Sequence, residues 1–242
     1  SRAFSAANLV TFAVYAALSG VMFLVVLNLQ VVVGFTALDA GISMLPVTVL
    51  MLLLSARGGA LSQRIGPRIP MTAGPIVCAG ALLLFSRIGA HATYLPDVLP
   101  AVVTLGLGLS LTVAPLTATA LGAVDERHAG IASGVNNAVA RAAGLLAVAI
   151  LPLAAGLGGG SLTIAGDLGP MYRRAMLICA GLLLVGAGTA FASIPTKIPA
   201  KDTPPEEQQD EAPHHYCAIA GTPLGGHRDR RDAPADAAVD DH

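Results

Sequence analysis

The chain has 242 residues, of which 54% are hydrophobic and only 12% are charged, and its mean hydropathy is +0.70. Because soluble domains carry about 25% charged residues, this composition excludes an ordinary soluble domain. The formal net charge of −1 gives no indication of nucleic acid as a partner, since nucleic acid binding needs a basic surface.

Six apolar runs follow one another along the chain, each close to the roughly 20 residues that a helix needs to cross a bilayer. The runs are continuous, whereas membrane strands alternate over about 10 residues, so they predict helices. We therefore expect an all-α membrane protein within residues 1–194. It would be a six-transmembrane-helix bundle with spans at about 9–33, 42–61, 71–88, 98–121, 133–157 and 175–194.

Polar residues on the first span recur at steps of three or four, which places them on one stripe of a helix with about 3.6 residues per turn. The fourth span carries a similar stripe, with Pro115 available to kink the helix. Polar side chains in membrane helices face protein or a water-filled cavity. They can alternatively bond to their own helix and only pack. The predicted substrate-pathway residues are Asn8, Thr11, Tyr15, Ser19, Met22 and Gln30 on the first span and Thr104, Thr112 and Thr119 on the fourth. Asn28 points away from the stripe and is expected to bond another segment.

The connection between the second and third spans is short, basic and glycine-containing. Glycine allows close backbone approach and positive φ, and Pro67 and Pro70 suit the start of the next helix. Arginines here can bond the carbonyls that end the preceding helix. A plain cytoplasmic basic loop is the alternative. The residues singled out are Gly59, Arg64, Gly66 and Arg68.

The fifth span repeats small residues at Gly130, Gly134 and Ala138, which favours close helix approach. It also contains Arg141, the only ionisable residue well inside a predicted span. A charge there costs roughly 2.5–3.5 kcal/mol unless it finds a partner, and Asp125 or Glu126 are possible partners. We expect a structural and charge clamp formed by Asn136, Asn137 and Arg141, with a direct role toward substrate or protons as the alternative.

No chemistry on a substrate is indicated. The cysteines at 78, 179 and 217 form neither a disulfide framework nor a zinc spacing, so no metal and no cofactor is predicted. Ser133 has no matching His in a later span, and no His-Glu-x-x-His occurs, which excludes the intramembrane proteases considered. No catalytic residue is assigned.

Orientation is predicted from the basic residues near the span ends, which are concentrated on the cytoplasmic side of membrane proteins. With a cytoplasmic N-terminus, seven such residues lie inside and three outside, so both termini are predicted to be cytoplasmic in a multi-pass protein of the cell membrane. The inside set is Arg2, Arg57, Arg64, Arg68, Arg127, Lys197 and Lys201, and the outside set is Arg87, Arg173 and Arg174.

Residues 195–242 differ from the rest, because they hold ten of the 15 acidic residues and are rich in Pro, Asp and Ala. This composition predicts a disordered cytoplasmic tail. The chain begins with Ser rather than Met, so we expect a piece of a longer protein.

The pattern Gly59-x-Leu61-x-x-Arg64-x-Gly66-x-Arg68 resembles the signature loop of the major facilitator superfamily. The resemblance implies a cytoplasmic gate loop that holds neighbouring helices during rocking. The family commonly has Asp just before the first Arg, and this chain has Gln63 there. The salt bridge and helix cap made by that Asp are therefore not carried over.

Three further patterns resemble the fourteen-span drug/proton antiporters of that superfamily. They are Leu27-x-Leu29-Gln30-x-Val32-x-Gly34, Ala40-Gly41-x-x-x-Leu45-Pro46 and Gly130-x-Ala132-Ser133-Gly134-x-Asn136-Asn137-x-x-x-Arg141-x-x-Gly144. The family usually has Gln after that Arg, where this chain has Ala142.

This resemblance implies the C-terminal half of a secondary transporter that exports drugs or other small amphipathic molecules in exchange for protons, by alternating access. Its implied partners are the lipid bilayer, an N-terminal half, the small-molecule substrate and protons. No Asp, Glu or His lies inside a predicted span, and in the resembled family the coupling carboxylates lie largely in the other half. The alternatives are a homodimeric six-span transporter and a non-transporting membrane scaffold.

Overall fold

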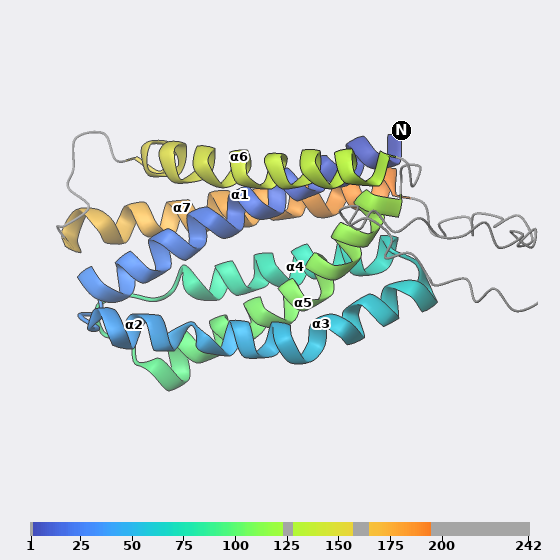
Figure 1. The fold of residues 1–242 in the computed structure, drawn as a ribbon. Helices are drawn as coiled ribbons and strands as arrows, with labels where there is room; N and C mark the ends of the chain where they lie inside the picture. Colours follow the sequence, from blue (N-terminus) through green and yellow to red (C-terminus); the bar gives the residue numbers. More distant parts are fainter. Residues whose placement is uncertain (1, 123–127, 157–164, 195–242) are drawn as a thin grey trace, which may run out of the picture. The chain divides into compact units, whose positions relative to one another are not determined.

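A computed structural model describes residues 2–122, 128–156 and 165–194 (Figure 1). The described residues form helices and contain no strand. In chain order the elements are α1 (Arg2–Val31), α2 (Ala37–Ser43), α3 (Leu45–Ile65), α4 (Arg68–Phe85), the π-helix η1 (Tyr94–Val98), α5 (Leu99–Gly122), α6 (Ala129–Ala154) and α7 (Ala165–Ser193).

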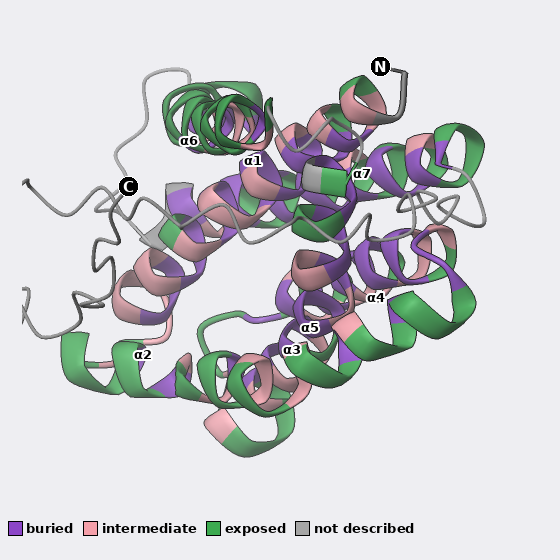
Figure 2. Ribbon diagram, turned by 45° about the vertical axis from the view of Figure 1, so that its right-hand side comes forward, coloured by how far each residue is buried: buried purple, intermediate pink, exposed green. Residues whose placement is uncertain are grey.

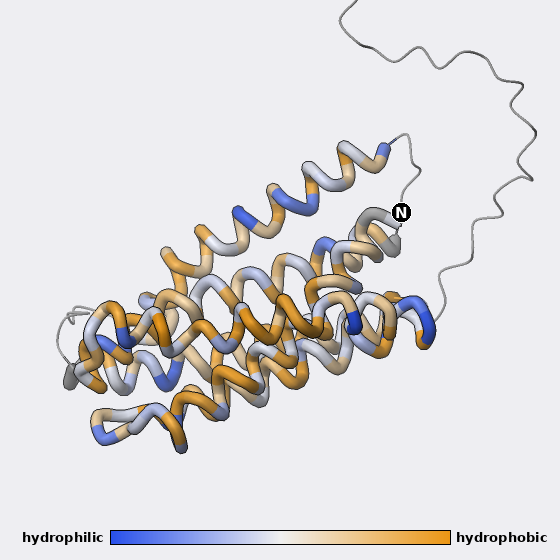
Figure 3. Tube along the Cα trace, turned by 60° about the horizontal axis from the view of Figure 1, so that its bottom comes forward, coloured by the Kyte–Doolittle hydropathy of each residue, from blue (hydrophilic) through white to orange (hydrophobic). Residues whose placement is uncertain are grey.

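Six helical segments of the described chain are long and apolar enough to cross a membrane, which confirms the all-α, six-span prediction. They follow the six apolar runs in order, with α2 and α3 together forming the second span and η1 and α5 the fourth. The trace in Figure 3 is mostly apolar or neutral in hydropathy along these helices, as a bilayer requires.

The helices extend beyond the apolar runs, because backbone hydrogen bonds continue into polar residues that hydropathy does not count. α6 begins at Ala129 rather than at 133, and α7 begins at Ala165 rather than at 175. Arg173 and Arg174 are therefore exposed residues within α7. The predicted tail, together with Asp125, Glu126 and Arg127, lies outside the described residues.

Two acidic residues, Asp39 and Asp97, lie in the first turns of helical segments. Thr36, the N-cap of α2, accepts a hydrogen bond from the Asp39 backbone nitrogen and donates its hydroxyl to Asp39 Oδ2 at 2.6 Å. Asp97 Oδ2 accepts from the Thr93 backbone nitrogen at 2.8 Å at the start of η1. Both carboxylates thus stabilise helix starts, where the backbone leaves unpaired N–H groups.

Helices α1, α4, α5 and α7 make up the interior of the bundle, whereas α3 packs mainly on α5 and α6 mainly on α1. Figure 2 shows the consequence, with α3 and α6 largely exposed. Only 17% of the most apolar stretch of each of these two spans is buried, against 44–56% for the other four. Two of the six spans therefore have a broad face that no described part of this chain covers.

The α4–α5 contact depends on glycines that let the two backbones approach. A Cβ atom added at Gly108 would lie 2.8 Å from the Cys78 backbone nitrogen, and Gly74 faces Thr112 in the same way. Larger residues at these positions would separate the helices.

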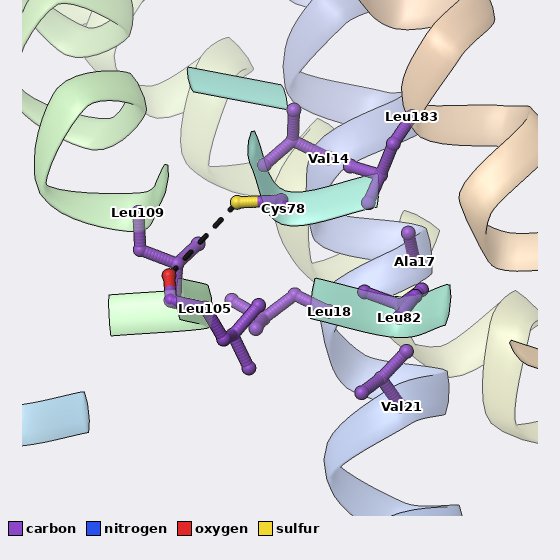
Figure 4. Close-up of a pocket in the computed structure, with 9 residues that line it drawn as sticks. All are labelled: Val14, Ala17, Leu18, Val21, Cys78, Leu82, Leu105, Leu109 and Leu183. Atoms are coloured by element: carbon purple, nitrogen blue, oxygen red, sulfur yellow. Dashed lines mark hydrogen bonds between the residues drawn. The ribbon is translucent and has the colours of Figure 1, made fainter. Parts of the chain in front are cut away.

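A small void lies between α1, α4, α5 and α7. It has a volume of about 10 Å³, and the apolar side chains that line it, including Val14, Leu105 and Leu183, are drawn in Figure 4. A water needs roughly 10–15 Å³ and several polar partners. Apart from the thiol of Cys78, which faces the Leu105 carbonyl oxygen at 4.0 Å, the lining offers only aliphatic side chains. This void therefore provides no polar pathway among the described residues that line it.

Candidate functional site

The polar stripe predicted on α1 lies on a partly covered face of that helix. Asn8, Tyr15, Ser19, Met22 and Gln30 are all half-buried. This intermediate burial means that the other described helices cover the stripe only in part. Whether the stripe lines a substrate pathway stays a prediction.

Asn28, which the helical spacing separates from the stripe, is fully buried. Its side-chain nitrogen donates to the Ile88 carbonyl oxygen at 3.3 Å, just beyond the end of α4. This contact confirms the prediction that Asn28 bonds another segment of the chain.

Thr11 differs from its neighbours on the stripe, because it is fully buried against α6. Its hydroxyl lies 2.9 Å from the Ala7 carbonyl oxygen and 2.9 Å from Asn136 Oδ1 and donates to both. Thr11 is therefore an interhelical contact in the described chain, and its predicted pathway role stays a prediction. The helical spacing groups Thr11 with the stripe but does not show that α6 covers that side.

Ser19 also contributes to the α1–α6 contact. A Cβ atom added at Gly144 would lie 2.7 Å from Ser19 Oγ, so the serine hydroxyl is seated directly over this glycine. Asn136 and Gly144 thus fix α6 to α1 at two levels, and Asn136 has the structural part of the role predicted for it.

The threonines predicted as a second stripe on α5 do not share one environment. Thr104 is half-buried and donates to the Pro100 carbonyl oxygen at 2.7 Å. Thr112 is fully buried, donates to the Gly108 carbonyl oxygen at 2.7 Å and packs on Gly74 of α4. This face of α5 meets α4, so Thr112 packs between two helices in the described chain, and a pathway role for Thr112 stays a prediction. Sequence spacing identifies a shared helix face but not its neighbour.

The connection from α3 to α4 turns at Gly66, which has φ 86° and ψ 158°. Residues other than glycine rarely adopt this backbone conformation. The positive φ expected at this loop is therefore confirmed at Gly66. Arg64 lies in the last turn of α3, where its charge complements the negative end of the helix dipole. Gly59 is half-buried inside α3 and has no positive φ, so the expected positive φ is found at Gly66 and not at Gly59.

Arg68 has a different environment from Arg64. Its guanidinium carbon lies 4.1 Å from the centre of the Phe191 ring near the end of α7. This cation–π contact, of a kind that contributes about 0.5–2 kcal/mol, ties the start of α4 to α7. Phe191 was not singled out from the sequence, since an aromatic residue near a span end has many possible roles.

An open cavity of about 390 Å³ lies between the end of α3, the turn and the last part of α5. Unlike the void in Figure 4, this cavity has several polar side chains among its otherwise apolar walls. Thr119, predicted as a pathway residue, is one of them: it is 3% exposed and its hydroxyl has no hydrogen-bond partner. The lining residues are Gly59, Ser62, Gln63, Arg64, Gly66, Pro67, Pro115, Ala118 and Thr119.

Part of the uncovered surface of α6 is polar, although exposed apolar side chains such as Ile131, Leu145 and Leu153 lie on the same helix. Gly130, Gly134, Asn137 and Arg141 recur at helical steps that place them on one face, and all four are exposed. No atom lies within ordinary contact distance of a Cβ added at either glycine. Asn137 and Arg141 therefore point away from Asn136, and the three residues do not form one cluster. We call this four-residue surface the polar face of α6.

Among the described residues, no group of three His, Cys, Asp or Glu side chains is placed to hold a metal ion. The arrangement instead combines a partly covered polar stripe on α1, an uncovered polar face on α6 and a basic turn beside a cavity.

Comparisons with known proteins agree with this geometry. A family model described as Major Facilitator Superfamily matches residues 1–148. The chain is 33% identical over 172 residues to a probable actinorhodin transporter of Streptomyces coelicolor, which is 69% of this chain and 30% of that protein.

Two other relatives carry names of the same kind. Similarity to the multidrug resistance protein Stp of Mycobacterium tuberculosis is 34% over 131 residues, covering 53% of this chain and 23% of Stp. Similarity to the cephamycin export protein CmcT of Amycolatopsis lactamdurans is 29% over 139 residues, covering 57% of this chain and 29% of CmcT. The chain thus matches less than a third of the length of these relatives.

Proposed function

We propose, because the chain belongs to the Major Facilitator Superfamily, that it is the C-terminal half of a transporter exporting drugs or other small amphipathic molecules in exchange for protons. Family membership and the six helices make it a multi-pass membrane protein with a transporter role. The observation that carries the more specific proposal is the polar face of α6.

A helix face that meets lipid is expected to be apolar, since an arginine in hydrocarbon costs roughly 2.5–3.5 kcal/mol even on the mildest scales. Asn137 and Arg141 are exposed near the middle of a membrane-spanning helix. Their surroundings must therefore be another protein surface or a water-filled cavity. The low burial of α3 extends this uncovered region to a second helix.

A second six-helix half would provide both a protein surface and a water-filled cavity next to α6. Related transporter halves pack about an axis along the membrane normal and bind substrate between them. The half-buried stripe on α1, from Asn8 to Gln30, would then border the shared cavity beside α6. Rocking of the two halves would open this cavity alternately to each side of the membrane.

Proton coupling requires a titratable group along the pathway. The described carboxylates, Asp39 and Asp97, are engaged at helix starts. The coupling carboxylates are therefore assigned to the missing half. The names of the relatives, which refer to an antibiotic, several drugs and a cephamycin, support an amphipathic organic substrate.

The proposed location is the cell membrane with both termini in the cytoplasm, which follows from the distribution of arginine and lysine about the spans. On this orientation the α3–α4 turn, with Arg64 and Arg68, is the cytoplasmic gate loop.

Thiol labelling tests the polar face of α6. In a Cys217→Ser background, Asn137→Cys in the chain alone should react with a water-soluble maleimide. Leu184→Cys, which replaces an exposed apolar residue of α7, should not react, because it would face lipid. Adding an N-terminal half of a related exporter should protect the first position from a bulky maleimide. In the chain alone, equal labelling of both positions, or none at position 137, would contradict a water-accessible face.

A further inference from the structure

We propose that the cavity beside the α3–α4 turn is a binding site for a phosphate group, carried by an anionic lipid headgroup or by a small soluble phosphate. This inference concerns the chain by itself and does not depend on transport. The cavity, of about 390 Å³, is far larger than the roughly 10–15 Å³ that one water occupies.

The hydroxyl of Thr119 is the observation that points to a ligand. Every other hydroxyl of α5 donates to the carbonyl four residues earlier, as Thr104, Ser110, Thr112 and Thr117 each do. Thr119 alone among the described hydroxyls of that helix has no partner, although it is 97% buried and lines the cavity. A buried hydroxyl without a partner is unfavourable, and a ligand atom in the cavity would satisfy it.

The charge of the described lining favours an anion. Arg64 is the one charged residue among the described residues that line the cavity. α4 begins at the same wall, with no acidic residue in its first turn and no side-chain hydrogen bond at its N-cap, Pro67. The positive end of a helix dipole and an arginine together favour a negative group.

The remaining polar lining favours a phosphate over a simple halide. Ser62, Gln63 and Arg64 are consecutive residues of α3 that line the cavity. Hydroxyl, amide and guanidinium donors therefore come from α3, and the Thr119 hydroxyl comes from α5. A tetrahedral oxyanion has several acceptor oxygens and can bond both walls at once. A chloride ion presents a single centre. Gln63 contributes a donor here that a carboxylate at the same position would not.

The test measures phospholipid binding to the purified full chain in neutral detergent by native mass spectrometry at physiological ionic strength, where diffuse attraction is screened. We expect phosphatidylglycerol to bind at least tenfold more tightly than phosphatidylcholine. Arg64→Gln should weaken that binding roughly tenfold, and Thr119→Val roughly fivefold, since each removes a hydrogen bond to a charged group.

Two matched variants serve as controls. Arg57→Gln removes an exposed arginine of α3 that does not line the cavity, and Thr117→Val removes a hydroxyl already bonded to the Val113 carbonyl oxygen. Both should change phospholipid binding less than twofold. Equal losses for Arg57→Gln and Arg64→Gln, or unchanged binding in Thr119→Val, would overturn the proposal.

The unfolding temperature separates binding from folding and identifies the source of the phosphate. Without phosphate, Thr119→Val should unfold at the same temperature as the wild type or higher, because it replaces an unpaired hydroxyl by a methyl group. Stabilisation of the wild type by millimolar inorganic phosphate, lost in both cavity variants, assigns a soluble phosphate. Stabilisation by phosphatidylglycerol alone assigns a lipid. No stabilisation by either would refute the site.

Discussion

Replacing Thr11 by Val tests the contact that joins α6 to α1. Thr11 is fully buried and its hydroxyl bonds Asn136 Oδ1 at 2.9 Å, so the substitution removes one interhelical hydrogen bond while keeping the side-chain shape. Such bonds in membrane proteins contribute about 0.6 kcal/mol on average and up to about 1.7 kcal/mol. The expected change in the unfolding equilibrium is therefore about threefold to twentyfold.

A double-mutant cycle isolates the free energy of the hydrogen bond between Thr11 and Asn136, because each single variant also leaves a buried polar atom unpaired. Thr11→Val, Asn136→Leu and the double variant would be compared by reversible unfolding in mixed micelles. We expect a coupling energy of about 0.6–1.7 kcal/mol. The matched cycle with Asn137→Leu should give none, since Asn137 is exposed on the opposite side of the contact. Coupling near zero at Asn136, or equal coupling at Asn137, would refute the reasoning.

Three further predictions address the turn, the cation–π contact and the stripe. Gly66→Ala should destabilise the chain by about 1–3 kcal/mol, because Gly66 has a positive φ. Gly59→Ala should stabilise it by up to about 1 kcal/mol, because Gly59 is helical and has room for a Cβ atom. Unfolding titrations in which both variants changed stability in the same direction would contradict this. Phe191→Leu should cost about 0.5–2 kcal/mol in the wild type and nothing beyond lost packing in an Arg68→Gln background, and an equal loss in both backgrounds would exclude the cation–π contribution. In a complete transporter, Tyr15→Phe should alter substrate preference in export assays and Thr112→Val should not, because Tyr15 is half-buried and Thr112 is fully buried. The reverse outcome would indicate that Thr112, and not Tyr15, contacts the substrate.

The sequence predicts the membrane spans well because their signal is local. A run of apolar residues is sufficient to identify a span, and all six are found in the described chain. The ends of the helices are harder to predict from the sequence, since hydropathy identifies the part of a helix in lipid and not its full hydrogen-bonded length. α7 shows this most clearly, because it begins well before the apolar run and includes Arg173 and Arg174.

The sequence predicts which candidate functional residues share one face of a single helix, but not which other helix that face contacts, because the neighbour of a helix face depends on tertiary packing. Thr112, which is buried against α4, is an example. Contacts such as Arg68 with Phe191, and the cavity beside Thr119, join residues far apart in the chain. No pattern within a single span indicates them.

The central claim, that this chain is one half of an exporter, is tested most directly by drug and proton flux in vesicles. The chain would be reconstituted alone and together with a separately expressed N-terminal half of a related exporter. We expect coupled flux only from the pair, because the described spans carry no carboxylate away from the helix starts. Coupled flux from the chain alone would contradict the account and would point to a homodimeric transporter.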